Sequence, residues 1–415
     1  MFKSSKSYLI TFAALFSFST ALSQSGEIKK LVKKNDIKAL ENLFKKNPKE
    51  IEKLKKTNEE FLIIALNKNF KDLAKYLINN GANPNVQNLY GETALYIALE
   101  EDYLDIAELL INKGANLNVQ NSYDETALQI ALKYNYQDIA KLLIEKGVNL
   151  NAQNSVGETA LHIASDNNFL DVVKLLINKG ANFDLTTEDG GTALHIALKR
   201  GYLDVAKLLI NKGANLNQTT KDGETALYIA LEKGYLDIVE LLINKGANLN
   251  LRYGKKTALY IALKGNYRDI AKLLIKNGAN LNLQYGKDKK TALYIALEKD
   301  YLDIVELLIN KGANLNLQCG KGKRTALYIA LEKGYLDIVK LLITKGANLD
   351  LQDIVGKTAL HLALEKDYLD IVKLLITKGA NLDLQDIVGK TALHIASKKG
   401  YLDIVKLLKE AQLKK

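Results

Sequence analysis

The sequence predicts a mainly α-helical solenoid in which helix-turn-helix units stack one after another. Three observations predict this fold class. The tripeptide Thr-Ala-Leu recurs ten times, beginning at residues 93, 126, 159, 192, 225, 257, 291, 325, 358 and 391. The copies are 32 to 34 residues apart, a period typical of repeat architectures. The 415 residues include only two prolines, and 47% of them are hydrophobic, so the composition favours packed helices over a disordered chain.

The unit that begins at Thr225 shows how one repeat is expected to fold. Its threonine precedes a short apolar helix and can cap it with the side-chain hydroxyl, while Gly234 ends that helix. A second helix is predicted over 236–245, with an apolar stripe too wide to be covered on one side only. Neighbouring units before and after it would cover that stripe. Gly246 stands at the helix end, and the Ala-Asn-Leu-Asn segment after it is expected to form the connecting loop.

The first residues are predicted to be a secretion signal. Lys3 and Lys6 precede an apolar stretch over 8–18. The small-x-small sequence at 21–23 then predicts cleavage after Ser23. The apolar stretch is shorter than the ~20 residues that a membrane-spanning helix needs, although an uncleaved N-terminal anchor is the alternative. We therefore expect a bacterial, exported protein, either periplasmic or secreted, that is monomeric and has no membrane span after signal cleavage.

Capping units are expected at both ends of the solenoid. Residues 24–59 carry a weak helix-pair pattern rich in lysine and are predicted to be an N-terminal capping repeat. A degenerate repeat covers 60–92, nine full repeats cover 93–390, and a C-terminal capping repeat covers 391–415. Polar terminal units fit this organisation, because the outer face of a terminal repeat has no neighbour to cover it.

The repeat resembles a known family. Residues 157–164, Gly-Glu-Thr-Ala-Leu-His-Ile-Ala, follow the ankyrin pattern Gly-x-Thr-Pro-Leu-His-x-Ala, and Ile-Val, Leu-Leu and Gly-Ala-Asn segments match its second half. The chain resembles ankyrin repeats over about residues 27–412, or about twelve units, with Ala where the family has Pro. The resemblance implies stacked helix pairs with β-hairpin finger loops. It also implies a scaffold that binds another protein through these fingers and the concave faces of the first helices.

Neither the histidines nor the recurring aspartates predict catalysis. All four histidines lie three residues after the threonine of their repeat, at His162, His195, His361 and His394. Equivalent atoms in adjacent repeats are about 8–10 Å apart, too far for ligands of one zinc ion, so we interpret them as structural. Ten aspartates from Asp105 to Asp403 share one place in the first turn of a second helix, where a carboxylate favours the helix dipole. The sequence therefore predicts a non-enzymatic protein without a metal or cofactor.

Charge and cysteine content bound the choice of partner only loosely. The formal charge is +11, carried mostly by lysines interspersed with Glu and Asp, which favours anionic partners in general. Cys319 is the one cysteine, so no internal disulfide can form. We expect it at an exposed loop position, either as neutral drift or as the site of an intermolecular disulfide.

The three consecutive irregular repeats carry basic loops, at 252–256, 285–290 and 319–324. Their cations, with Asp288 the only acid among them, are Arg252, Lys255, Lys256, Lys287, Lys289, Lys290, Lys321, Lys323 and Arg324. We hypothesise that these residues, with Tyr253 and Tyr285, contact an acidic protein surface. Two alternatives remain: a local duplication without function, and an electrostatic surface for nucleic acid or envelope polysaccharide. Only the two tyrosines could stack on bases.

Overall fold

The computed structural model describes residues 26–49, 51–52 and 60–413. The predicted secretion signal at 1–23 lies outside the described residues. Within the described ranges, no helix is both long and apolar enough to cross a membrane. The chain divides into two compact units of stacked helices, unit 1 ending at Glu188 and unit 2 beginning at Asp189.

The helices of both units come in pairs, a first and a second helix per repeat. The described helices of unit 1 are α1 (Gly26–Lys33), α2 (Ile37–Lys46), α4 (Phe61–Asn67), α5 (Lys71–Asn79), α6 (Ala94–Glu100), α7 (Leu104–Asn112), α8 (Ala127–Lys133), α9 (Gln137–Glu145), α10 (Ala160–Asp166) and α11 (Leu170–Asn178). The described helices of unit 2 are α12 (Ala193–Arg200), α13 (Leu203–Asn211), α14 (Ala226–Lys233), α15 (Leu236–Asn244), α16 (Ala258–Lys264), α17 (Arg268–Lys276), α18 (Ala292–Glu298), α19 (Leu302–Asn310), α20 (Ala326–Lys333), α21 (Leu336–Thr344), α22 (Ala359–Glu365), α23 (Leu369–Thr377), α24 (Ala392–Lys399) and α25 (Leu402–Leu413).

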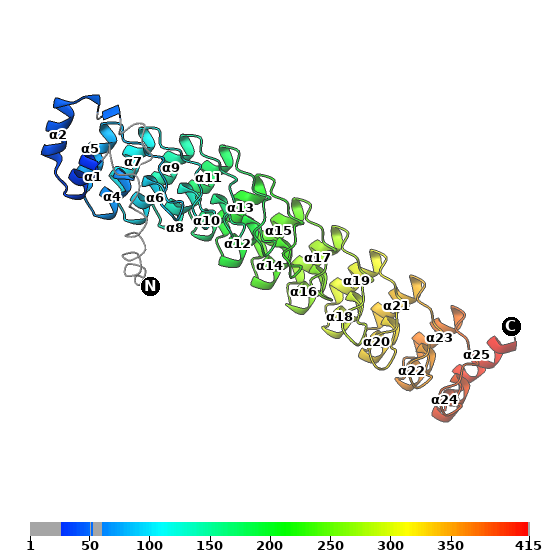
Figure 1. Cartoon of the computed structure of the whole chain (residues 1–415). Coiled ribbons are helices and arrows are strands. Elements are labelled where there is room, and N and C mark those ends of the chain that lie inside the picture. The colour runs from blue at the N-terminus through cyan, green and yellow to red at the C-terminus, as the bar shows by residue number, and fades with distance from the viewer. Residues whose placement is uncertain (1–25, 50, 53–59, 414–415) are drawn as a thin grey trace. The chain divides into compact units, whose positions relative to one another are not determined.

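Each unit has two layers of helices. First helices pack against first helices of neighbouring repeats, and second helices pack against second helices (Figure 1). The core lies between the layers, where Ala230 and Leu231 of α14 and Val239 and Leu242 of α15 are fully buried. The wide apolar stripe of the second helix is therefore covered from several sides, and the predicted solenoid of stacked helix-turn-helix units is confirmed.

The predicted helix boundaries of the repeat at Thr225 are confirmed within one residue. The hydroxyl of Thr225 accepts the backbone N–H of Tyr228 at 3.1 Å, as expected for an N-cap. Gly234 ends α14 in the left-handed region at φ 74°, and Gly246 follows α15 at φ 85°. In the loops, β-pairing among the described residues is limited to isolated bridges in the three irregular repeats, so the implied β-hairpin fingers are short turns elsewhere.

The histidines have the structural role that their position predicts. Nδ1 of His361 accepts the backbone N–H of Thr358 at 3.3 Å, and its other ring nitrogen lies 3.0 Å from the carbonyl oxygen of Lys390 in the next loop. Nδ1 of His162 accepts from Thr159 in the same way. Burial lowers the pKa of His195, so that ring is held neutral. No group of three or more His, Cys, Asp or Glu side chains suited to a metal ion occurs among the described residues.

Candidate partner-binding surface on the middle loops

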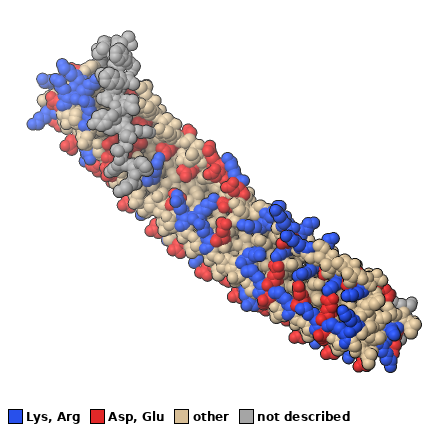
Figure 2. All heavy atoms as spheres, turned by 90° about the horizontal axis from the view of Figure 1, so that it is seen from below, with Lys and Arg blue, Asp and Glu red and all other residues tan. Residues whose placement is uncertain are grey.

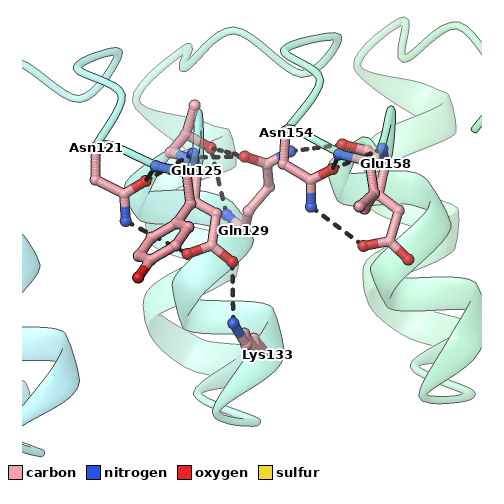
Figure 3. Close-up of polar contacts among 9 residues, drawn as sticks. Asn121, Glu125, Gln129, Lys133, Asn154 and Glu158 are labelled. Atoms are coloured by element: carbon pink, nitrogen blue, oxygen red, sulfur yellow. Dashed lines mark hydrogen bonds and ion pairs between the residues drawn. The ribbon is translucent and has the colours of Figure 1, made fainter. Parts of the chain in front are cut away.

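An ordinary loop of this protein is closed by an asparagine or aspartate side chain. Oδ1 of Asn121 accepts the backbone N–H groups of Tyr123 and Glu125 at 2.9 and 3.0 Å. Its amide also donates to the Glu125 carboxylate at 3.3 Å, and Asn154 and Glu158 repeat the arrangement one repeat later (Figure 3). The loop is thereby fixed by one short polar side chain, as in an Asx-turn.

The three basic loops are closed differently. Tyr253, Tyr285 and Cys319 stand where ordinary loops have Asn, Asp or Thr, and cannot form the same turn. Instead, two backbone hydrogen bonds of 2.9 to 3.1 Å join the ends of each loop in an antiparallel bridge. The bridged pairs are Tyr253 with Lys256, Tyr285 with Lys290, and Cys319 with Arg324. The residues between the bridged ends form the loop tips.

The first bridged residue of each basic loop packs beside the first helix that precedes the loop. The ring centroids of Tyr253 and Tyr228 are 4.2 Å apart, and those of Tyr285 and Tyr260 are 4.6 Å apart. The hydroxyl of Tyr285 is 2.8 Å from that of Thr257, and the residue is only 3% exposed. Tyr285 therefore anchors its loop, and its burial argues against the predicted contact with a partner. Tyr253 is half-buried and keeps part of its ring accessible.

Cys319 is also buried, with only 2% of its surface exposed. Its Sγ faces the hydroxyl of Thr291 and the carbonyl of Leu317. Burial raises the pKa of the thiol, which reduces the thiolate available for reaction. The expectation of an exposed position is therefore wrong, and the intermolecular disulfide is disfavoured because the thiol replaces a buried tyrosine as the anchor of its loop.

Seven of the nine predicted cations are exposed at this surface: Arg252, Lys255, Lys256, Lys287, Lys289, Lys321 and Lys323. The other two pair with acids on the first helix that follows their loop. Lys290 contacts Glu298 at 2.7 Å, and Arg324 contacts Glu332 at 2.9 Å. Desolvation lowers the pKa of Lys290, but the Glu298 carboxylate outweighs it and the pKa is raised overall. These two cations support their loops and are less available to a partner.

Backbone contact brings two of the basic loops together. The backbone N–H of Gly320 donates to the carbonyl of Asp288 at 2.7 Å, so the second and third loops lie side by side. Figure 2 shows the region of unit 2 as a mixed face, where Lys and Arg groups alternate with Asp and Glu groups. We name the seven exposed cations of the three loops the basic loop surface. This surface differs from the mixed face around it because the cations lie in loops that contain only one acid.

A family model described as "Ankyrin repeats (3 copies)" matches the chain in overlapping stretches, at residues 29–121, 61–154, 115–187, 180–253, 213–285, 251–319, 283–353 and 327–415. These stretches cover most of the sequence. The chain belongs to the ankyrin repeat family. Ankyrin repeats generally serve as non-enzymatic scaffolds for protein–protein interaction.

Solved ankyrin structures are also similar to this chain. An ankyrin repeat domain from Acinetobacter baumannii AYE is 29% identical, with a TM-score of 0.43 over 46% of this chain and 99% of that one. The ankyrin repeat domain of Bcl-3, a member of the IkappaB protein family, is 27% identical, with a TM-score of 0.45 over 52% of this chain and 98% of that one. A comparison with curated proteins found no match.

Two lysines of the basic loop surface have an unusual backbone conformation for their residue type. Lys289 and Lys323 have φ values of 51° and 50°, in the left-handed region. Most other ankyrin repeats of the chain have glycine at this position, two residues before the threonine, as at Gly157 and Gly356. A Cβ at Gly157 would lie 2.9 Å from the backbone nitrogen of Glu188 in the next loop. Loops 285–290 and 319–324 have a lysine side chain there, at the expense of a strained φ, and Asp124 is the non-glycine residue with a similar φ, 57°, in loop 121–125.

Sequence reasoning missed these two conformations, although a signal was present. Glycine at the aligned position of most repeats indicates a positive φ, and lysine in its place indicates strain. Sequence reasoning also missed that Tyr285 and Cys319 are buried and anchor their loops. A signal was present here too, because a tyrosine replaces the histidine of the ankyrin pattern in the first helix before each basic loop, at Tyr228, Tyr260 and Tyr294.

Proposed function

We propose that this ankyrin protein is an exported, non-enzymatic scaffold that binds an acidic surface of another protein through the basic loop surface. The observation that carries the proposal is the exposure of seven cations on three consecutive loops, which contain one carboxylate between them. Complementary charge of this kind steers association and fixes the orientation of a partner. The concave faces of the first helices would add contact area. Export rests on the signal predicted at 1–23.

Strain at Lys289 and Lys323 supports a function for these loops over neutral duplication. A lysine in the left-handed region is less stable than glycine by about 1 kcal/mol, and such strain concentrates at binding sites. Two consecutive repeats keep a lysine in that conformation, each at the tip of a loop held by a backbone bridge. Each bridge restricts its loop before binding, which reduces the entropy lost on association.

The burial of Tyr285 weakens the alternative of a nucleic-acid surface. Binding of single strands combines a positive groove with aromatic rings that stack on bases. Only Tyr253 remains partly accessible in the basic loops. An anionic polysaccharide or duplex needs no stacking, so these ligands are distinguished by their dependence on salt. Their binding releases condensed counterions, and added salt reduces that gain, so the affinity falls steeply between low and moderate ionic strength.

A cross-linking pull-down tests the proposal with the predicted mature chain, residues 24–415, in extract from the exported compartment. The test variant changes Lys255, Lys289 and Lys323 to Glu. A matched control changes Lys212, Lys245 and Lys311 to Glu, which alters the net charge equally at exposed ends of second helices in the same unit. A protein captured by the native chain and the control, but lost by the test variant, supports the proposal. Equal capture by all three contradicts it. Recovery of only nucleic acid or polysaccharide, lost at moderate salt, favours the electrostatic alternative.

A further inference from the structure

Apolar side chains are exposed at the loop tips of unit 1. They belong to three consecutive loops, at 88–92, 121–125 and 154–158, and their exposed fractions run from 48% at Val156 to 84% at Leu89. Tyr90 and Tyr123 lie between these limits. Scattered single apolar residues are normal on a protein surface, whereas a contiguous group indicates an interaction site.

Backbone hydrogen bonds show that these tips are contiguous. The N–H of Ser122 donates to the carbonyl of Tyr90 at 3.2 Å, and the N–H of Ser155 donates to that of Tyr123 at 3.1 Å. The N–H of Glu188 extends the series to Val156 at 3.0 Å. Each tip is therefore joined to the next, and Tyr90, Tyr123 and Val156 occupy the same place in successive loops. We call these three residues with Leu89 the apolar tip row.

The loops that carry the apolar tip row are acidic. Together with the start of the next loop at 187–188 they contain five carboxylates and no Lys or Arg, the carboxylates being Glu92, Asp124, Glu125, Glu158 and Glu188. The basic loops of unit 2 have the opposite composition, nine cations and one carboxylate. A surface of unit 1 thus combines apolar contacts with negative charge.

Three of these carboxylates are held in place before any partner binds. The amide of Asn88 donates to the carboxylate of Glu92 at 2.6 Å. The amides of Asn121 and Asn154 donate in the same way to Glu125 and Glu158, at 3.3 and 3.1 Å (Figure 3). Glu125 is less available to a partner than the others, because it pairs with Lys133 at 3.0 Å and its side chain is only 14% exposed. Asp124 and Glu188 are exposed beside the tips. A positively charged partner would therefore meet carboxylates whose side-chain freedom is already restricted.

The distance between successive tips of the row is close to the distance between successive heptad positions of an α-helix. Stacked repeats are about 8–10 Å apart, as packed helices are. An α-helix rises 1.5 Å per residue, so positions seven residues apart are about 10.5 Å apart on nearly the same face. A partner helix lying along the row can thus place one apolar side chain at each tip, with cations beside them for the carboxylates.

We infer that the apolar tip row is a second binding surface, which takes an amphipathic helix of another protein that is apolar on one face and basic beside it. It is separate from the basic loop surface, and neither surface requires the other. The protein would then bind two partners of opposite charge, one on each unit.

A labelled model helix of about 21 residues tests the inference. The probe has Leu at every seventh position with Lys and Ala elsewhere, and its binding to the protein purified from cells expressing the full chain is measured by fluorescence anisotropy. One comparison peptide has the same composition with Leu spaced irregularly, and another has Glu in place of Lys. We expect the heptad-spaced Lys peptide to bind at least about tenfold more tightly than either comparison peptide.

Substitutions at the tips locate the binding. The triple variant Tyr90→Ser, Tyr123→Ser, Val156→Ser should lose about tenfold in affinity for the Lys peptide. The matched variant Ile354→Ser, Ile387→Ser, Val388→Ser changes exposed apolar loop tips of unit 2 and should bind as the native chain does. All six positions are exposed, and circular dichroism confirms that both variants keep their helices. Unchanged affinity of the first variant, or equal binding of the irregular peptide, overturns the inference.

A second copy of this chain is the other occupant that the experiment must distinguish from a partner helix. If sedimentation shows that the native chain dimerises and the tip variant does not, a second copy of the chain occupies the row and the inference of a partner helix is overturned. The Lys255, Lys289 and Lys323 variant should bind the Lys peptide normally. This result separates the second surface from the proposed function, since either can fail without the other.

Discussion

Asn217 of one repeat accepts, at its side-chain Oδ1, the backbone N–H of Asn248 in the next repeat at 2.7 Å. Asn248 in turn accepts the N–H of Asn250 at 3.0 Å, and Oδ1 of Asn250 accepts from Asn280 in the following repeat at 2.8 Å. The recurrent Asn-Leu-Asn segments thereby form a ladder that joins successive repeats of unit 2. The same ladder joins repeats of unit 1 through Asn85, Asn116 and their equivalents.

Replacing one asparagine of the ladder should weaken the stack. Asn217→Ala leaves the N–H of Asn248 without its side-chain acceptor, and we expect a loss of about 0.5–1.5 kcal/mol in the free energy of unfolding, the usual contribution of one hydrogen bond. Urea denaturation followed by circular dichroism measures it. Asn211→Ala, at the exposed end of α13, is the control and should change stability less. Equal effects of both substitutions would show that the ladder adds nothing.

Glycine at the strained lysines should not destabilise the protein. Lys289→Gly removes the Cβ that makes a φ of 51° unfavourable, a gain of about 1 kcal/mol, and this offsets the greater freedom of glycine in the unfolded chain. We expect stability equal to or slightly above that of the native chain, together with weaker binding of the acidic partner. Lys287→Gly at the same tip relieves no left-handed strain and should lower stability by about 0.5–1 kcal/mol. Similar destabilisation by both changes, measured in urea, would contradict the strain argument.

Asp303 should contribute to stability at neutral pH and lose that contribution in acid. Lys272 and Arg268 of the preceding repeat contact its carboxylate at 2.6 and 2.5 Å, and the hydrogen bond from Lys272 leads the effects that lower the pKa of Asp303 to about 2. Because the pKa in the folded state is below the ordinary value of 3.8, the stabilisation is present above pH ~4 and is lost as the pH falls from 3.8 towards 2.

Asp303→Asn tests this pH dependence. The side chain is partly exposed, so solvent screening limits the expected loss at pH 7 to at most about 1 kcal/mol. The difference between the native chain and the variant in urea denaturation should shrink as the pH falls below 3.8 and vanish only below the folded-state pKa of about 2. Asp237→Asn, at the equivalent position of an earlier repeat, is the comparison. A difference that is constant across this range would exclude an ionic contribution from Asp303.

The thiol of Cys319 should react slowly in the folded protein. It is buried and its pKa is raised, so both access and thiolate content are reduced. We expect the reaction with a disulfide reagent to be at least about tenfold slower in buffer than in denaturant, where the same chain exposes the thiol. Rapid modification without denaturant, or a disulfide-linked dimer on a non-reducing gel, would show that the loop 319–324 opens readily.

The local features of the repeat could be predicted from the sequence because they depend on near neighbours in the chain. Thr225, Gly234 and Gly246 mark helix ends through short-range hydrogen bonds and backbone conformation, and each has the predicted role. Seven of the nine predicted cations of the basic loops are exposed, and their contact with a partner stays a prediction. The sequence did not distinguish exposed from paired cations. Lys290 and Arg324 form ion pairs with acids eight residues later, on the first helices that follow their loops.

By itself the sequence determined the repeat, the class of fold and the place where positive charge gathers, because a fixed period of apolar residues and caps is encoded within each unit. Only the tertiary structure decided which loop residues face inward. Tyr285 and Cys319 are polar-loop residues by position, yet they are buried because Thr257 and Thr291, at the starts of the first helices that precede their loops, lie against them. Folding brings together residues that are about one repeat apart in the sequence. A pattern of near neighbours in the sequence cannot predict contacts over that separation.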